Sequence, residues 1–340
     1  MTPSLPGALG AIDWLALGDG VVEASGWLLH PAHPIDAVRL AIDGVVVGEA
    51  PVVARPDVAA AFAAVAHAEA SGLRVRAPFA AAAALLRVEA IGLAGGRPVI
   101  ATADYWPAGG VPAVPAPGPA LMERVSGGSD AARFDRAGLN IAAQLLAAVR
   151  AHLPGVAVPR LLDWGCGPAR ATRFMAGLWP GLRPVGCDID AEAIAWCRAN
   201  LADAAFHATA PYPPLPFADG AFDAVVAASV MTHLAGEVQV RWLAEIRRVL
   251  APSGVLVASV HGPLAAVTLP AAQRAVLARD GLLDGTPDPR LDGIAPAGYY
   301  RATYQTEAHT RRLWARGFTV RDWRAGGLAN WQDLVVLRRN

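Results

Sequence analysis

Residues 161–170, with the sequence LLDWGCGPAR, constrain the fold of this chain more than any other stretch. An apolar segment ends in Asp163 and breaks into a turn with two glycines, Gly165 and Gly167, after which residues 171–178 have a helical pattern. A strand that turns sharply into a helix N-terminus brings backbone N–H groups close to a ligand, because glycine has no Cβ to hold the ligand off. Such a turn also occurs without a ligand, so the residues downstream decide between the two interpretations.

The chain from residue 161 onward alternates between strand and helix patterns, which is typical of a doubly wound, Rossmann-like α/β domain. Expected strands lie at 161–164, 184–188, 205–207, 222–229 and 255–260, with helices at 171–178, 191–200 and 238–250. Residues 262–308 form an irregular connection that is long for a compact fold, which indicates a lid or a substrate pocket. Two final strands, 318–323 and 333–337, are expected to join through Gly326-Gly327.

Asp188 ends the second expected strand, 21 residues after Gly167. A carboxylate at this spacing can accept both hydroxyl protons of a ribose, and Ile189 beside it can pack on an adenine. The alternative role for Asp188 is an N-cap of the next helix, which Asp190 fills equally well. Arg170 stands where a dinucleotide-binding turn has its third glycine, so the turn favours a nucleoside without pyrophosphate.

S-adenosylmethionine is such a nucleoside, and its amino-acid end carries an ammonium and a carboxylate. Asp163 suits the ammonium, and Arg170 with the helix N-terminus suits the carboxylate. The expected cofactor contacts are therefore these residues: Asp163, Gly165, Cys166, Gly167, Arg170, Asp188, Ile189 and Ser229.

The C-terminal part of the chain resembles the class I S-adenosylmethionine-dependent methyltransferases. The resemblance rests on segments that follow the order of that family: 161–167, 186–190, 214–217, 219–223, 229–234 and 248–254. One departure is that no acidic residue directly follows the third strand, so Thr209 or a backbone carbonyl would hold the adenine amine. Alternatives are a non-catalytic glycan-assembly scaffold that keeps the nucleoside fold, and an NAD-dependent oxidoreductase, which Arg170 disfavours.

Three short segments, 195–197, 232–234 and 332–333, resemble a bacterial subgroup found with glycan- and sugar-modifying enzymes. This resemblance implies methyl transfer to an oxygen of a sugar or glycan intermediate.

His233, just past the fourth strand, is the first candidate for a general base, and His261 after the fifth strand is the second. A structural role in bracing the loop is the alternative for His233. The aromatic residues Tyr299, Tyr300 and Tyr304 are candidates for a substrate pocket or for packing of the lid.

Residues 1–106 have short strands with turn signals and are expected to form an accessory β-sandwich. They resemble the all-β domain at the front of some bacterial glycan-assembly enzymes, through Gly26-Trp27, segments 34–38 and 43–44, and segment 55–58. This implies binding or scaffolding near carbohydrate; a role in folding or dimerisation is the alternative. Residues 107–128, rich in Pro, Ala and Gly, are the expected linker, and 129–340 the expected methyltransferase domain.

The composition restricts partners and location. The formal net charge is zero and the pI is about 7.1, so neither nucleic acid nor an anionic membrane is an expected partner. No apolar run is long enough to span a bilayer. The three cysteines, Cys166, Cys187 and Cys197, have no C-x-x-C spacing, which predicts reduced thiols, a cytoplasmic location and no metal site. The oligomeric state and the acceptor remain open at this level.

Overall fold

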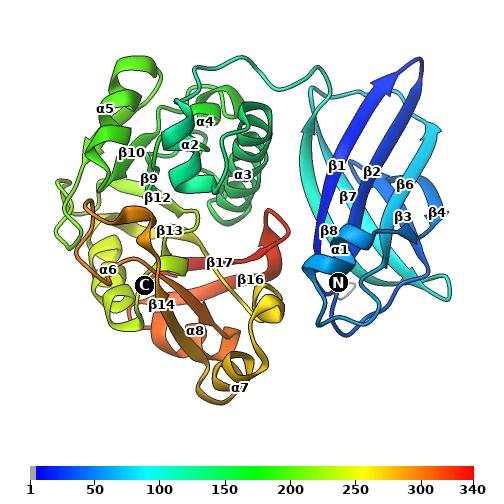
Figure 1. Cartoon of the computed structure of the whole chain (residues 1–340). Coiled ribbons are helices and arrows are strands. Elements are labelled where there is room, and N and C mark those ends of the chain that lie inside the picture. The colour runs from blue at the N-terminus through cyan, green and yellow to red at the C-terminus, as the bar shows by residue number, and fades with distance from the viewer. Residues whose placement is uncertain (1–4) are drawn as a thin grey trace. The chain divides into compact units, whose positions relative to one another are not determined.

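The structure is a computed structural model that describes residues 5–340. It divides the chain into two compact units (Figure 1). The first unit holds the chain up to Gly110 together with Gly262–Arg274 and Arg324–Asp333. The second holds Val111–His261, Ala275–Trp323 and Leu334–Asn340.

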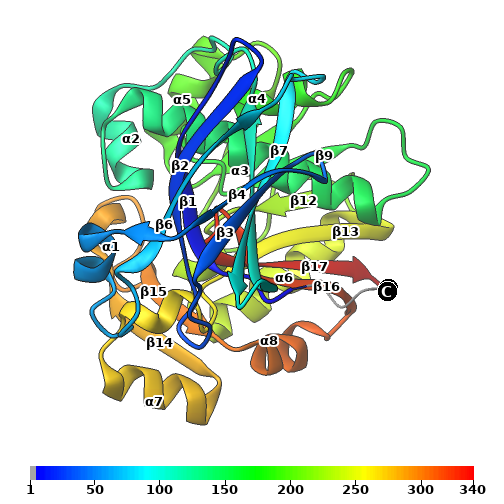
Figure 2. The ribbon, with the colours of Figure 1, turned by 90° about the vertical axis from the view of Figure 1, so that its right-hand side faces the viewer.

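The first unit is built from eight strands and one short helix, α1 (Pro56–Ala61). The strands are β1 (Leu9–Gly18), β2 (Val21–Leu29), β3 (Ala37–Ile42), β4 (Val45–Pro51), β5 (Val53–Ala54), β6 (Ala70–Pro78), β7 (Leu85–Ala94) and β8 (Arg97–Pro107). They form two four-stranded antiparallel sheets, in the orders β1-β2-β6-β5 and β4-β3-β7-β8. Figure 2 shows these strands in blue to cyan.

The sheets form because their strands alternate between buried and half-exposed side chains, as in β2 and β7. The predicted hairpin at Asp43-Gly44 is present, with φ of 51° and 82° at the two turn residues. Positive φ at both positions matches the twist of the flanking strands. Buried residues of both sheets share one apolar cluster, which includes Leu15, Val22 and Val88.

A second apolar cluster of the first unit includes residues from late in the sequence. Leu264 and Val267 belong to it together with Leu9 and Phe62. Val267 lies in the 3₁₀ helix η2 (Ala265–Thr268), and Leu264 directly precedes that helix. The Trp331 ring lies 6.3 Å from the Phe62 ring. This unit is therefore assembled from segments that are more than 150 residues apart in the sequence.

The second unit contains most of a seven-stranded sheet in the order β11-β10-β9-β12-β13-β17-β16, and the parts of the last two strands within Arg324–Asp333 belong to the first unit. These strands are β9 (Leu161–Trp164), β10 (Val185–Asp188), β11 (Ala205–Ala208), β12 (Phe222–Ala227), β13 (Leu250–Val260), β16 (Phe318–Leu328) and β17 (Gln332–Arg339). The helical elements are α2 (Pro119–Ser126), α3 (Ala131–His152), α4 (Thr172–Leu178), α5 (Ala191–Asn200), η1 (Met231–His233), α6 (Gly236–Val249) and α8 (Glu307–Trp314).

The sheet has the doubly wound arrangement that the sequence predicts. The pairs β11-β10, β10-β9, β9-β12 and β12-β13 are parallel. Helices α3 and α4 lie on one side of the sheet, and α6 and α8 on the other (Figure 1). All four residues of β9 are buried, as expected of a strand covered on both faces. The Rossmann-like α/β class is thus confirmed.

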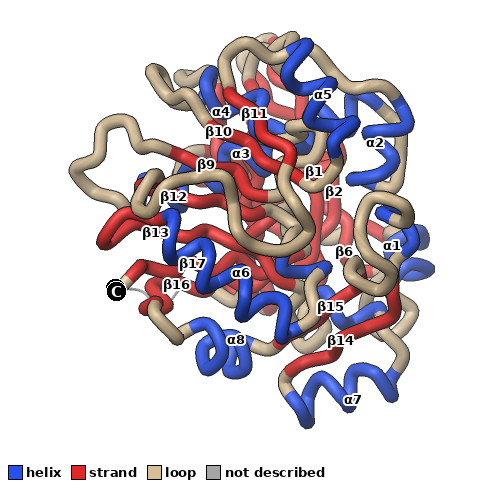
Figure 3. Tube along the Cα trace, turned by 90° about the vertical axis from the view of Figure 1, so that its left-hand side faces the viewer, coloured by secondary structure: helices blue, strands red, loops and turns tan. Residues whose placement is uncertain are grey.

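The long connection after β13 is more regular than the sequence predicts. Besides η2 it contains α7 (Ala271–Asp280), β14 (Leu282–Pro287), η3 (Pro289–Leu291) and β15 (Arg301–Gln305). Strands β14 and β15 pair antiparallel as a separate two-stranded sheet (Figure 3). The prediction of an irregular segment was wrong. The strand pairs join residues about 20 apart in the sequence, so they produce no short-range hydrophobic periodicity from which the strands could be predicted.

The turn between the last two strands is also displaced from its predicted place. Gly326-Gly327 lies inside β16, and the turn is at Ala329-Asn330, where φ is 52° at both residues. Asn adopts this left-handed conformation more readily than most residues. Within residues 5–340, no helix is long and apolar enough to cross a membrane.

Candidate active site

A pocket opens at the carboxyl ends of β9, β10 and β12, where α/β folds hold their ligands. It encloses about 1080 Å³ of empty space, including the open solvent at its mouth. The predicted residues that line it are Asp163, Gly165, Cys166, Gly167, Arg170, Asp188, Ile189, Ser229, His233, Tyr299 and Tyr300. His261 and Tyr304 do not line it.

The glycine turn forms the floor of the pocket. Gly165 and Gly167 have φ of 75° and 54°, a region that favours glycine. The backbone N–H groups of Gly165 and Cys166 both donate to the carbonyl oxygen of Cys187, at 2.8 and 3.1 Å. The turn after β9 is thus tied to the neighbouring strand β10.

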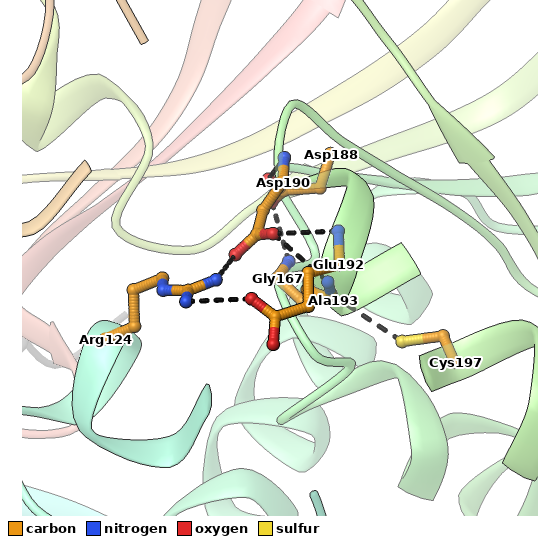
Figure 4. A network of polar contacts seen from close by, with 7 residues as sticks. All are labelled: Arg124, Gly167, Asp188, Asp190, Glu192, Ala193 and Cys197. Carbon is orange, nitrogen blue, oxygen red and sulfur yellow. Dashed lines mark hydrogen bonds and ion pairs between the residues drawn. The ribbon is translucent and has the colours of Figure 1, made fainter. Parts of the chain in front are cut away.

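Asp188 is held by the backbone at both carboxylate oxygens (Figure 4). Its Oδ2 accepts from Gly167 N at 2.7 Å, and its Oδ1 accepts from Asp190 N at 2.8 Å. Burial raises the pKa of this carboxyl, and the two backbone bonds oppose that rise. An ionised carboxylate has about four acceptor sites, so Asp188 retains acceptor capacity for the hydroxyls of a ribose.

Asp190 fills the capping role that was the alternative for Asp188. Its Oδ1 accepts from the backbone N–H groups of Glu192 and Ala193 at the start of α5, both at 3.1 Å. Its other oxygen pairs with Arg124, whose guanidinium also reaches Glu192 at 3.0 Å (Figure 4). Asp190 is therefore the N-cap of α5, and Asp188 is not needed for that role.

Helix α2 contributes to the pocket although its residues fall inside the predicted linker. Arg124 and Val125 both line the pocket. A Cβ on Gly167 would lie 3.1 Å from Val125 Cγ1, so this helix packs directly against the turn. Pro119 at the helix start and Gly127 in the left-handed conformation at its end are the sequence signals that indicate this helix. Other lining residues that the sequence analysis did not assign to the site are Trp164, Leu234, Trp242 and Leu291.

Asp163 and Arg170 bring opposite charges to the inner end of the pocket. Asp163 is 2% exposed and accepts from Thr172 Oγ1 at 2.5 Å. Burial raises the pKa of Asp163 to about 6, with Thr172 opposing and Asp188 adding to the rise. Burial lowers the pKa of Arg170. Tyr300 and Asp163 oppose this shift through their charges, and Arg170 lines the pocket, where an anionic group of a ligand could reach it.

Two of the lining rings, His233 and Tyr300, are continued outside the pocket by the rings of His261 and Tyr304. Tyr300 stacks on His233 with centroids 4.1 Å apart, and His261 stacks on Tyr304 at 4.8 Å. The two histidine rings meet edge to face at 6.0 Å. Tyr304 therefore reaches the pocket wall only through the two histidines, while Tyr300 contacts the pocket directly.

Both histidines are neutral and have a defined tautomer. His233 Nδ1 lies 3.1 Å from the carbonyl oxygen of Arg301, and His261 Nδ1 lies 3.2 Å from that of Thr303. A carbonyl oxygen only accepts, so Nδ1 carries the proton and Nε2 is the basic nitrogen. Burial, with His261 and Arg290 nearby, lowers the pKa of His233 to about 3. Burial likewise lowers the pKa of His261 to about 4.

Comparison with known proteins adds direct information about the chemistry. Residues 162–258 match the family model described as a methyltransferase domain. Over 211 residues, the chain is 28% identical to a trans-aconitate 2-methyltransferase of Methylobacterium radiotolerans, covering 61% of this chain and 77% of the relative. The protein is an S-adenosylmethionine-dependent methyltransferase. This result replaces the interpretations as a non-catalytic scaffold and as an NAD-dependent oxidoreductase.

Two further similarities were found for this methyltransferase. A trans-aconitate 2-methyltransferase of Afipia carboxidovorans is 34% identical over 56 residues, which are 16% of this chain and 22% of the relative. An S-adenosylmethionine-dependent methyltransferase structure from Mesorhizobium loti is 18% identical, with a TM-score of 0.42, and covers 58% of this chain and 98% of that one. Among the residues that the structure describes, no group of His, Cys, Asp and Glu side chains is arranged to hold a metal ion.

We expect binding of S-adenosylhomocysteine to release a proton below about pH 6. An ammonium of the ligand placed beside Asp163 would stabilise the carboxylate and so lower a pKa that burial holds at about 6. Affinity should then fall as the pH drops from about 6 towards 4, by up to roughly tenfold per pH unit. Calorimetry in two buffers with different heats of ionisation measures the proton. Asp163→Asn should abolish this release; a wild-type enzyme whose binding shows no proton exchange would contradict the assignment.

Proposed function

We propose that this enzyme methylates a carboxylate oxygen of a small-molecule acceptor. The observation that carries the proposal is one pocket that joins Asp188 and the glycine turn to the wall of His233 and Tyr300. Donor and acceptor would meet between these two sides. Positioning of two reactants in this way supplies much of the acceleration of a transfer reaction.

The cofactor side of the proposal assigns one role to each charged residue. Asp188 accepts from the ribose hydroxyls, Asp163 faces the ammonium, and Arg170 pairs with the carboxylate. The bound cofactor supplies a methyl group on a positively charged sulfur. The residues present fit this group, because Asp188 keeps unused acceptor sites and Arg170 lines the pocket as a cation.

The acceptor side favours an oxygen that is already ionised. A hydroxyl must lose a proton as it is methylated, and His233 would have to take it. Burial and the nearby Arg290 disfavour a charged His233, whose pKa is lowered to about 3. A carboxylate near neutral pH needs no base. The relatives named as trans-aconitate methyltransferases also support a carboxylic acid as the acceptor.

A hydroxyl oxygen of a sugar or glycan intermediate is the second candidate. It is favoured by His233 Nε2, which the bond at Nδ1 leaves as a proton acceptor at the pocket. In this version the first unit would be a β-sandwich that holds or orients carbohydrate, in a cytoplasmic glycan pathway. The predicted domain boundaries, 1–106, 107–128 and 129–340, belong to the same proposal.

Base treatment of the product distinguishes the two acceptors. The enzyme is incubated with methyl-tritiated S-adenosylmethionine and either a panel of di- and tricarboxylic acids or a panel of sugars and nucleotide sugars. We expect label in the acids, released as volatile methanol by mild alkali because a methyl ester hydrolyses. A methyl ether on a sugar keeps its label under the same treatment, and label confined to ethers would contradict the carboxylate proposal.

The same assay with His233→Ala tests whether a base is used. With a carboxylate acceptor we expect a loss in kcat of less than about tenfold. At saturating cofactor, the pH dependence of kcat should show no ionisation of a general base near neutrality. General-base catalysis typically contributes about 10²–10⁴-fold. A loss of that size, with unchanged affinity for S-adenosylhomocysteine, would assign His233 as the base and favour the hydroxyl acceptor. His261→Ala, one ring further from the pocket, serves as the control.

A further inference from the structure

Gln239 is fully buried on α6, and its side-chain amide bonds to three other elements. Its Nε2 lies 3.0 Å from the carbonyl oxygen of Met231, 3.1 Å from that of Leu234 and 2.9 Å from Gln305 Oε1. Its Oε1 accepts from Trp314 Nε1 at 3.0 Å. Of these four partners, Leu234 lines the pocket, whereas Met231, Gln305 and Trp314 do not.

The orientation of this amide follows from its partners. An indole N–H can only donate, so the group facing Trp314 must be the oxygen. A backbone carbonyl can only accept, so the group facing Met231 must be the nitrogen. A flipped amide would set two donors against each other and two acceptors against each other. These hydrogen bonds therefore admit one orientation of the Gln239 amide. A fully satisfied buried network of this kind fixes the separation of the elements that it joins.

The two carbonyls that Gln239 binds flank the element that carries His233. Met231 begins η1 and Leu234 follows its last residue, His233. The third partner, Gln305, ends β15, and it donates to Thr310 Oγ1 at 2.7 Å, which donates in turn to Thr306 O at 2.9 Å. Gln239 thus links η1, the element that carries His233, to β15, the strand whose Arg301 carbonyl oxygen bonds to His233 Nδ1.

Strand β15 supplies the acceptors that orient the two histidines. Arg301 and Thr303 present their carbonyl oxygens to His233 and His261, and Tyr300, stacked on His233, directly precedes the strand. A change in the distance between η1 and β15 would therefore move His233, its hydrogen bond and the stacked Tyr300 together.

We propose that Gln239 is a positioning residue for the acceptor side of the pocket: it fixes η1 against β15 and so holds His233 and Tyr300 at the acceptor. This inference rests on the proposed function, because it takes the acceptor to lie against these two rings. The cofactor side is held by separate bonds, those of Asp188 and of the glycine turn. Loss of the Gln239 bonds should therefore affect the acceptor and leave the cofactor.

Gln239→Glu is the sharpest test because it keeps the shape and removes the donor. Above the pKa of the introduced carboxyl, a carboxylate faces the carbonyl of Met231 and the two repel. A buried carboxyl has a raised pKa, and once protonated it again has one O–H donor. We expect acceptor kcat/KM to fall at least tenfold relative to wild type at about pH 8 and to recover partly as the pH falls towards 6. The Kd for S-adenosylhomocysteine should change less than twofold.

Two additional variants separate positioning from general destabilisation. Gln239→Met, close in shape but unable to make any of the bonds, should lose acceptor kcat/KM at every pH without recovery. Gln144→Glu makes the same substitution at another buried glutamine, on α3, and should show no recovery at low pH. Wild-type kinetics in both Gln239 variants, at all pH values and with the cofactor still bound, would overturn the inference.

A measurement that does not depend on turnover keeps the test of Gln239 separate from the assay that identifies the acceptor. Nitrogen-15 NMR of histidine-labelled protein reports which ring nitrogen of His233 carries the proton. We expect a single Nδ1–H tautomer in the wild type and a mixture in Gln239→Met. If the wild type methylates no carboxylic acid or sugar, the proposed function fails while this measurement still stands. If Gln239→Met keeps the single tautomer, the positioning role is wrong whatever the acceptor.

Discussion

Asp188→Ala is expected to weaken the binding of S-adenosylhomocysteine by about 1–3 kcal/mol, the worth of hydrogen bonds to a charged group. This corresponds to roughly 5- to 150-fold in Kd. The loss has two sources. The ribose hydroxyls lose their acceptor, and the N–H group of Gly167, which Asp188 holds at 2.7 Å, is released from its bond. Isothermal titration calorimetry measures the Kd directly.

Asp130→Ala is the matched control for this substitution. Asp130 also accepts a backbone N–H bond, from Arg133 at 2.8 Å, but it caps α3 and does not line the pocket. Its removal should cost about 1 kcal/mol of folding stability, as is typical of an N-cap, and leave the Kd unchanged. Equal Kd values for wild type and Asp188→Ala would show that Asp188 only shapes the turn.

Gly165→Ala is expected to lower the free energy of unfolding by about 2–5 kcal/mol and to impair cofactor binding in what remains folded. The φ of 75° costs an alanine about 1–2 kcal/mol. The added Cβ would lie 2.4 Å from Val230 Cγ2, and overpacking of this kind costs about 1–3 kcal/mol more. Urea denaturation gives the first quantity and calorimetry the second.

A second substitution divides this effect into its two parts. Val230→Ala in the same chain removes the atom that the new Cβ meets, so it should restore the packing contribution and leave the backbone strain. Ala169→Gly is the reverse control, because Ala169 already occupies a left-handed conformation in the same turn, with φ of 58°. It should not destabilise the protein by more than about 1 kcal/mol, the usual cost of glycine flexibility. Undiminished stability in Gly165→Ala would mean that the turn relaxes.

The family and the cofactor were predictable from the sequence because their signals are local. A buried strand, a turn with two glycines and an acidic residue at the end of the next strand are properties of short segments, and the spacing from Gly167 to Asp188 reflects one strand–helix–strand unit. The parallel sheet follows from the alternation of strands and helices along residues 161–260. In such a fold the carboxyl ends of neighbouring strands meet at one edge, which brings their ligand-facing residues together.

Other features depended on contacts between distant segments. Helix α2 lies in a stretch whose composition predicts a linker, and it reaches the pocket through tertiary contacts: Arg124 pairs with Asp190 and Glu192, and Val125 packs against the Gly167 turn. Residues 262–274 and 324–333 belong to the first unit although they follow the strands of the second. Sequence spacing carries no information about these long-range contacts. Each contact depends on which apolar or charged surfaces meet in the folded chain.

The environment of His233 was decided by tertiary structure. The sequence shows that His233 follows a strand and allows it either to take a proton or to brace a loop. Its protonation depends on burial and on Arg290, and its tautomer depends on a carbonyl of Arg301, 68 residues away. The sequence by itself indicated the methyl donor, through the turn with two glycines, Arg170 in place of a third glycine and Asp188 at the end of the next strand. The environment of the acceptor came only with the fold, because desolvation and long-range hydrogen bonds set the chemistry of a histidine and neither is encoded in adjacent residues.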